Sequence, residues 1–400
     1  MNLDLEQSLR ASQPVPPRLA PFGLGFRPFF LGAAAWAVLD ILLWLAIYRG
    51  MKIGSLYYDP ITWHAHEMIF GFTVAVIAGF LLTAVTNWTS HPGIRAWPLA
   101  GLFILWLAGR IVPLCAAWLP PIVIAGIDLA FIPALAFSLI PAIRKGKPIN
   151  WIFPCMLLGL TAANVAVHFQ VLGYTVVSAR TGLYAAIYLV LLLIQVIAGR
   201  VFPFFTEKAI PGAKPWRNPW INGVALGSYI AFVLVDLFIH HQGLITMLAL
   251  CTALAHAIRL SGWFVRGVLT RPILWILYAA YTWIILGFLL KAGVSTFHFS
   301  PYAALHAWTA GGIGVVCIGM MTRVSRGHTG RPMTVGKLGL VSFICINLAA
   351  LLRVAGTLVI SDFYVWAITI SAVLWALAYA LFLSGHAQML LYSRPDGKPG

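Results

Sequence analysis

Long runs of hydrophobic residues, separated by short polar segments, dominate the chain. Twelve of these runs reach about 20 residues, the length that a helix needs to cross the hydrocarbon core of a bilayer. The runs are continuous rather than alternating, which indicates helices and not the strands of a membrane barrel. We predict spans near residues 29–48, 64–87, 97–119, 121–143, 151–173, 180–204, 220–239, 243–263, 273–293, 301–321, 336–360 and 363–385. The pattern therefore predicts an all-α, polytopic membrane protein.

Composition supports the same prediction. Of the 400 residues, 61% are hydrophobic and 9% are charged, whereas a soluble protein carries about 25% charged residues. So few charged residues cannot cover the surface of a soluble protein of this size. We therefore expect the lipid bilayer to be its main partner. The five cysteines form no CxxC pair, and we interpret them as small buried hydrophobic residues.

The net charge of +16 is explained by where the cations lie. Nineteen Lys and Arg residues lie at ends and loops on the side of the N-terminus, and four lie on the other side: Arg49, Lys52, Arg180 and Lys291. Because cytoplasmic loops collect Lys and Arg, this asymmetry predicts that both termini are cytoplasmic. No nucleic-acid partner is needed to explain the charge.

A weak internal repeat has a period of 120 residues. Gly79, Gly199 and Gly319 follow this spacing, and twice the period joins His66 to His306. Proline opens both histidine-bearing spans, at Pro60 and Pro301, where it suits the first helical turn. We therefore predict a single transmembrane domain over residues 29–385, built as a pseudo-threefold arrangement of three four-helix units (29–143, 151–263 and 273–385). Cytoplasmic tails would occupy residues 1–28 and 386–400.

Two histidines at matched depth are the first candidates for chemistry. His66 and His306 lie six and five residues beyond the prolines that open their spans. Two imidazoles on different helices suit the axial positions of a haem iron, so we predict a b-type haem between them. His64 lies about 200° around the helix from His66 and is a candidate for a second site on the opposite face, either a second haem or copper.

Other ionisable residues within the spans need a partner or a function. Arg110 and Arg353 are candidates to hold haem propionates, or to form ion pairs with Glu67, Asp128 or Asp236. Glu67, beside His66, joins the candidate cofactor-binding residues. Further metal-ligand candidates are His168, His240 and His241. Asp40, Asp128 and Asp236 are candidates for a proton path. No residue is assigned a catalytic role.

Several strings of the chain resemble the NnrS family of bacterial membrane proteins. They are GFRPFF at 25–30, WHAHEM at 63–68, GFLLTA at 79–84, NWT at 87–89 and GHTGR at 327–331. The resemblance implies a twelve-span protein of the bacterial inner membrane that contains haem and also copper. It further implies expression with denitrification genes and protection against nitric oxide. The family's chemical activity is not settled, so a haem-dependent oxidoreductase acting on nitric oxide is one hypothesis.

The arrangement is also similar, at the level of architecture, to subunit I of the haem–copper oxidases. That subunit has three groups of four spans, with haem histidines on spans 2 and 10. Span 6 here carries no histidine, which argues against an oxidase-type dinuclear centre.

Two other functions stay open from sequence. A cofactor-free transporter or channel would use helix breaks, for which Pro203 and Gly311–Gly312 are candidates. An assembly factor would carry haem or copper to another enzyme. In the nitric oxide hypothesis the partners are haem, nitric oxide and an electron donor such as a quinol.

Overall fold

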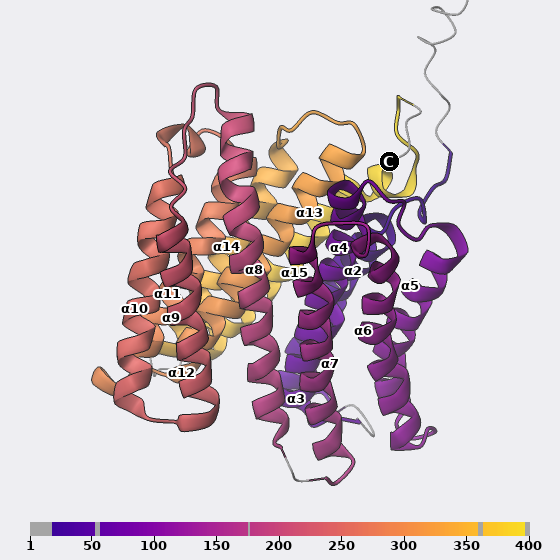
Figure 1. The fold of residues 1–400 in the computed structure, drawn as a ribbon. Coiled ribbons are helices and arrows are strands. Elements are labelled where there is room, and N and C mark those ends of the chain that lie inside the picture. The colour runs from indigo at the N-terminus through magenta and orange to yellow at the C-terminus, as the bar shows by residue number, and fades with distance from the viewer. Residues whose placement is uncertain (1–17, 53–56, 175–176, 359–362, 397–400) are drawn as a thin grey trace, which may run out of the picture.

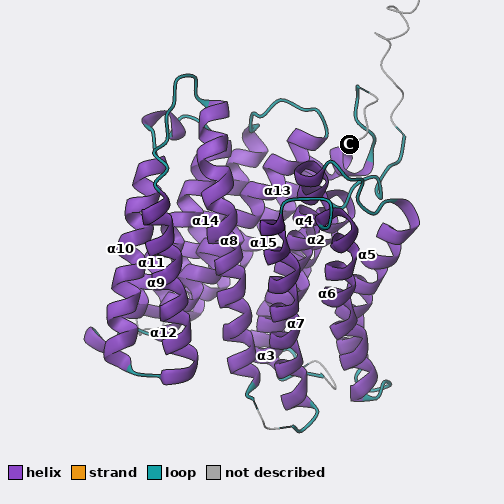
Figure 2. Ribbon diagram, viewed as in Figure 1, coloured by secondary structure: helices purple, strands orange, loops and turns teal. Residues whose placement is uncertain are grey.

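The computed structural model describes residues 18–52, 57–174, 177–358 and 363–396, which fold into twelve helical spans with no strand among them (Figures 1 and 2). The predicted all-α, twelve-span class is confirmed. The spans are α2 (Phe26–Tyr48), α3–η1–α4 (Pro60–Thr89), α5–η2 (Ala96–Cys115), α6 (Pro121–Ile143), η3–α7 (Pro148–Val171), α8 (Ala179–Ala209), α9–η4 (Pro219–Ile239), α10 (Gln242–Trp263), α11 (Pro272–Thr296), α12–η6–α13 (Pro301–His328), α14 (Lys337–Leu358) and α15 (Phe363–Leu391).

The start of the second span is fixed by its own sequence. Asp59 accepts hydrogen bonds at Oδ1 from the backbone N–H groups of Ile61 (3.1 Å) and Thr62 (3.0 Å). Pro60 occupies the first helical position, where a missing N–H costs nothing. This cap sets the rotation of α3 (Pro60–His66) and therefore the directions of His64 and His66.

Two histidine-bearing spans change their helical pitch immediately after the histidine. The π-helical segment η1 (Glu67–Thr73) follows His66, and η6 (Ala307–Gly314) follows His306. Within η1, the Thr73 hydroxyl donates to the carbonyl of Met68, five residues earlier, at 2.8 Å. A π-helical insertion re-aims the side chains around it and is frequent at functional sites.

The first and last spans lie against each other, because α15 packs on both α14 and α2. α4 (Val74–Thr89), α8 and α13 (Val315–His328) line a common apolar cavity, to which they contribute Val76, Leu193 and Val316 among others. Spans 2, 6 and 10 of the chain thus meet, as a ring of three units requires. The pseudo-threefold arrangement itself stays a prediction.

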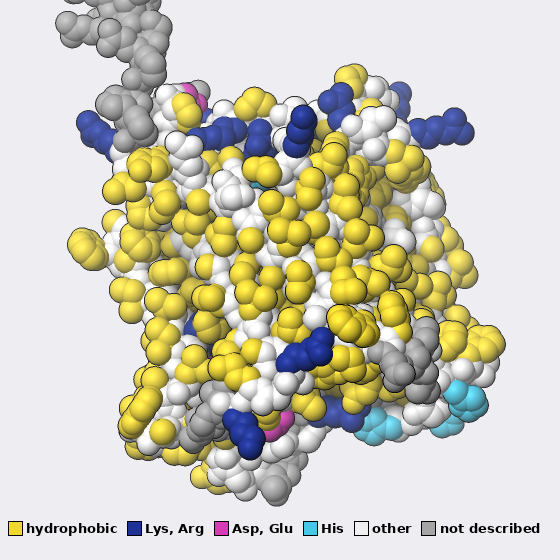
Figure 3. Space-filling view, turned by 180° about the vertical axis from the view of Figure 1, so that it is seen from behind, with side chains coloured by type: hydrophobic (Ala, Val, Ile, Leu, Met, Phe, Trp, Pro, Cys, Tyr) yellow, Lys and Arg dark blue, Asp and Glu magenta, His cyan; other side chains and the backbone are white. Residues whose placement is uncertain are grey.

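Both described chain ends lie on one face of the bundle (Figure 1). Leu19 pairs with Tyr392, and the Ala20 N–H donates to the Leu391 carbonyl at 2.8 Å. We call this the terminal face, and we call the far side the opposite face. Figure 3 shows a hydrophobic belt with Lys and Arg side chains along the terminal edge. Arg10 and Lys398 of the predicted cationic side lie outside the described residues, as do 1–17 and 397–400 of the predicted tails.

The helices extend beyond the predicted hydrophobic limits at both chain ends. α2 begins at Phe26, and α15 continues to Leu391 through His386. Arg27 is fully buried, because its Nη1 donates to the carbonyls of Met389 (3.2 Å), Leu390 (3.1 Å) and Tyr392 (2.6 Å). A cation at the end of a helix satisfies carbonyls that have no intrahelical partner, which lets a charged residue lie inside the bundle.

The helix breaks considered for a transporter do not form at the candidate positions. α8 continues through Pro203, and Gly311 and Gly312 lie within the continuous span α12–η6–α13.

The cation asymmetry leads to a topology prediction. Alkaline phosphatase, which is active only outside the cytoplasm, is expected to be active when inserted at Trp118 and inactive when inserted at Lys145. The physical reason is that Arg144, Lys145 and Lys147 hold their loop on the cytoplasmic side. The reverse activity pattern would overturn the orientation.

Candidate metal centre

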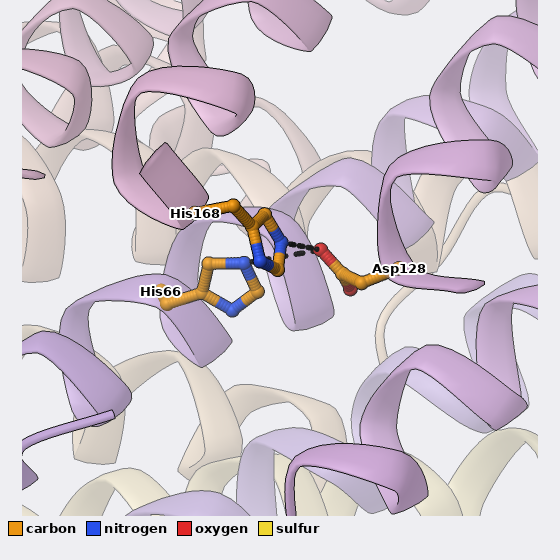
Figure 4. Close-up of side chains that lie close together, drawn as sticks. All are labelled: His66, Asp128 and His168. Carbon is orange, nitrogen blue, oxygen red and sulfur yellow. Dashed lines mark hydrogen bonds and ion pairs between the residues drawn. The ribbon is translucent and has the colours of Figure 1, made fainter. Parts of the chain in front are cut away.

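Three spans bring a fully buried polar cluster together, three side chains of which are drawn in Figure 4. The cluster lies toward the opposite face, where α3 is found (Figure 1). α3 contributes His66, α6 contributes Asp128, and α7 (Ile152–Val171) contributes Asn164 and His168. Asn164 and His168 are four residues apart and so share one helical face. All four side chains lie in residues that are at most 2% exposed.

The ligand atoms of this cluster converge on one point. Asp128 Oδ2 lies 3.2 Å from His66 Nε2 and 3.0 Å from His168 Nε2. The Tyr58 hydroxyl, on the segment before α3, lies 3.0 Å from His66 Nε2 and 3.2 Å from His168 Nε2. In a tetrahedral site with bonds of about 2.0–2.2 Å, ligand atoms are about 3.3–3.6 Å apart. The four distances are hydrogen-bond lengths slightly below this spacing, so these atoms would have to move apart by a few tenths of an ångström to hold a metal ion.

The other nitrogen of each imidazole has its own partner. His66 Nδ1 lies 3.1 Å from Glu67 Oε1, and His168 Nδ1 lies 3.0 Å from the Tyr57 hydroxyl. Metal-bound histidines commonly donate their second N–H in this way, to a carboxylate or another oxygen, which fixes the ring and its tautomer. Both imidazoles of the cluster are therefore held at their second nitrogen, as a metal site would require.

Arg110, on α5 (Ala96–Ile111), connects the two carboxylates. Its Nη1 donates to Glu67 Oε2 at 2.6 Å, and its Nη2 pairs with Asp128 Oδ1. Gly71 makes room for this pair, because a Cβ there would lie 2.8 Å from Glu67 Oε2 and 3.0 Å from Arg110 Nη1. The single charge of Arg110 neutralises only one of the two carboxylates, Glu67 and Asp128. The cluster therefore needs one more positive charge to be neutral, which a proton on His66 or a metal cation would supply.

Tyr58 is neutral in the cluster unless a cation is bound. Burial, followed by the charge of Asp128, raises the pKa of its hydroxyl well above the usual range. A metal ion beside this oxygen would act in the opposite direction and favour the phenolate.

A second polar group lies on the other face of α3. His64 stacks on Trp44 of α2, with ring centres 4.5 Å apart, and its Nδ1 lies 3.7 Å from Asp40 Oδ2. His306 on α12 (Pro301–His306) lies near it and donates from Nδ1 to the Tyr302 carbonyl at 2.7 Å, so its Nε2 carries no proton. The charges of His64 and Arg353 act on His306.

Four buried polar atoms of this second group have no hydrogen-bond partner in the described structure. Neither carboxylate oxygen of Asp40 has a hydrogen-bond partner, although the residue is 1% exposed. His64 Nδ1 and Arg353 Nη1 also have none. Buried polar groups are nearly always satisfied, so these atoms are the ones that a further polar group bound beside them would satisfy.

The structure thus sorts the residues predicted from sequence. His66 lies with His168, Glu67 and Arg110, and the ion pairs considered for Arg110 are present with Glu67 and Asp128. His306 lies with His64 and Arg353 instead of with His66.

The other predicted residues lie away from both groups. His240 and His241 are exposed on the opposite face, where His241 caps α10. Asp236 pairs with Lys291 at 2.7 Å and accepts from Tyr188 at 2.5 Å, away from both groups.

Three residues of the cluster were not predicted from the sequence. Asn164 is a lone amide in an apolar span, and Tyr57 and Tyr58 stand before the cap of α3. The one available signal was position: Asn164 precedes His168 by four residues, so an amide and an imidazole share a face of an otherwise hydrophobic helix.

Twelve spans around a buried histidine–carboxylate cluster define a polytopic helical membrane protein with a candidate metal centre. The family model described as NnrS protein matches residues 20–394, nearly the whole chain, and the chain belongs to this family. No curated protein matches the chain significantly.

The Arg110 pair predicts a large stability effect. Arg110→Ala leaves Glu67 and Asp128 buried without their cation, and we expect it to lower the free energy of unfolding by about 3–5 kcal/mol. The matched control is Arg217→Ala, which removes an exposed pair with Glu207 and should cost about 0–1 kcal/mol. Denaturant unfolding in mixed micelles measures both; equal effects would contradict a structural role for the buried pair.

Proposed function

We propose that this NnrS-family protein is a haem- and metal-binding protein of the bacterial inner membrane that binds nitric oxide and protects against nitrosative stress during denitrification. Family membership is consistent with that role. The observation that carries the proposal is the buried cluster of His66, Asp128 and His168, whose ligand atoms converge inside the membrane-spanning region.

The metal proposed for this cluster is copper. Two imidazole nitrogens with one carboxylate and a tyrosine oxygen suit a divalent transition metal, and imidazole is a good copper ligand. When bound, the metal supplies a redox-active centre with affinity for nitric oxide. The chain's own residues hold it: Arg110 fixes Asp128 and Glu67, and Glu67 orients His66.

The haem is proposed for the second group, between His64 and His306. His66 is not the proposed haem ligand, because its Nε2 faces Asp128 on α6 (3.2 Å) and Asn164 on α7 (2.9 Å). His64 shares its surroundings with His306, and Arg353 offers a guanidinium for a propionate carboxylate. With His64 and His306 as its ligands, a haem would supply electron transfer, and the residues of the copper site would hold the centre that binds nitric oxide. A membrane quinol is the donor class that this location favours.

Metal analysis provides the first test. We expect purified protein to hold about one copper ion in the cluster, and His168→Ala to lose most of it. Glu67→Gln removes the outer partner of His66 and should weaken metal binding about 10–100-fold. The exposed His241→Ala is the matched control and should retain the metal; equal loss in His168→Ala and His241→Ala would contradict the site.

Absorption spectroscopy tests the haem ligands separately. His64→Ala and His306→Ala are expected to lose the Soret band of the purified protein, while His66→Ala loses copper and keeps haem, because the two imidazoles of α3 face different groups. His91→Ala, on the terminal face, should keep both. Loss of haem in His66→Ala with retention in His64→Ala would return the axial role to His66.

A further inference from the structure

Two sequence motifs with no part in the proposed function meet on the terminal face. The Phe26 ring lies 5.7 Å from that of His328, so the segment at 25–30 contacts the segment at 327–331. The end of the chain joins them, because Arg394 Nη1 donates to the His328 carbonyl at 3.2 Å. Gly330 adopts φ +68°, and its missing Cβ leaves room for the Arg394 guanidinium.

This junction concentrates positive charge, and we call it the basic cluster (Arg27, Arg326, Arg331, Arg394, His328 and His386). The charges of Arg331 and Arg394 act on Arg27, and those of Arg326 and Arg331 act on His386. In the described part of the chain, Asp396 is the carboxylate that pairs with the cluster, through Arg394 at 2.7 Å. Arg394 therefore has a carboxylate partner, whereas the hydrogen bonds of the Arg326 and Arg331 side chains go to backbone carbonyls.

Two of these guanidinium groups still have donors to offer. Arg326 Nε donates to the Pro332 carbonyl at 2.7 Å, and Arg331 Nη1 makes a long contact of 3.4 Å to the Thr329 carbonyl. Both side chains are half-buried, and burial lowers the pKa of Arg331. Guanidinium groups in this position bind phosphate oxygens through paired N–H groups.

His386 adds a second and independent requirement. Its Nδ1 donates to the Phe382 carbonyl at 3.0 Å, so its Nε2 is a hydrogen-bond acceptor. The residue is 5% exposed, and this nitrogen has no partner. The Ser325 hydroxyl, in the residue before Arg326, is also fully buried without a partner. A group that bound here would need an anion for the arginines and a hydroxyl for His386.

We propose that the basic cluster is a binding site for a phosphate group that carries a neighbouring hydroxyl. Arg326 and Arg331 bind the phosphate oxygens, and His386 Nε2 accepts from the hydroxyl. The site lies on the terminal face, where α13 ends, and this face borders the hydrophobic belt (Figure 3), so a glycerophospholipid headgroup would lie at the same level. Monobasic phosphate from solution has the same chemistry.

Binding of phosphatidylglycerol, measured by native mass spectrometry of delipidated protein, tests the site. Because hydrogen bonds from charged groups are about twice as strong as neutral ones, Arg326→Gln combined with Arg331→Gln should weaken binding about tenfold or more. The matched control, Arg144→Gln with Lys145→Gln, removes the same charge from another loop of the terminal face and should change binding less than about twofold. Equal loss in the two double variants would overturn the proposal.

A variant of His386 tests whether the site recognises the headgroup hydroxyl and does not bind the lipid by positive charge alone. His386→Phe keeps every arginine but removes the acceptor. We expect it to weaken phosphatidylglycerol binding measurably and to leave unchanged the binding of phosphatidylmethanol, which carries the same single negative charge but lacks the headgroup hydroxyls. Unchanged binding of phosphatidylglycerol would overturn the role of His386. Thermal unfolding of each variant identifies any loss that comes from misfolding.

A parallel titration with inorganic phosphate, followed by ³¹P NMR, distinguishes the two sources. Phosphate binding that depends on Arg326 and Arg331 assigns the site to a soluble phosphate, whereas binding of the lipid alone assigns it to the bilayer. Binding of neither overturns the proposal. The copper and haem content of the variants should stay at the wild-type level, so the result does not depend on the proposed function.

Discussion

The balance of charge around Arg110 is the interaction on which the rest of the structure depends. A single guanidinium holds Glu67 and Asp128, which are both buried inside the membrane-spanning region. An uncompensated charge at this depth is costly. The pair therefore fixes how α5 and α6 pack on the second span, and with it the convergence of His66, His168 and Tyr58. The remaining negative charge is what makes the cluster suited to a cation.

The geometry of α3 explains how one short helix serves two groups. His64 and His66 are separated by two residues, so they point to different sides, one toward Asp40 and Trp44 and the other toward Asp128. The Asp59 cap fixes the beginning of the helix, and the π-helical segment after His66 turns Gly71 toward Arg110. The residues proposed to hold copper and those proposed to hold haem thus lie on either side of one helix.

Much of the site could be predicted because ionisable residues are scarce in this chain. Arg110, Arg353, Glu67, Asp128 and the histidines stood out against hydrophobic surroundings, and the opposite directions of His64 and His66 followed from helical geometry. The pairing of His66 with His306 rested on equal depth, which says nothing about direction around each helix. In the structure His66 faces α6 and α7, while His306 lies with His64 and Arg353.

The sequence by itself determined the twelve spans, the helical class and the sidedness of the charges, because the thickness of the bilayer and the cost of an unpaired peptide group leave little choice. Only the tertiary structure decided which polar residues meet. The contacts of His168, Asn164 and Tyr58 with His66 depend on how the spans rotate and pack, and a hydrophobic helix carries little information about its rotation. The same holds for the basic cluster, where residues near both ends of the chain meet through α2, α13 and α15.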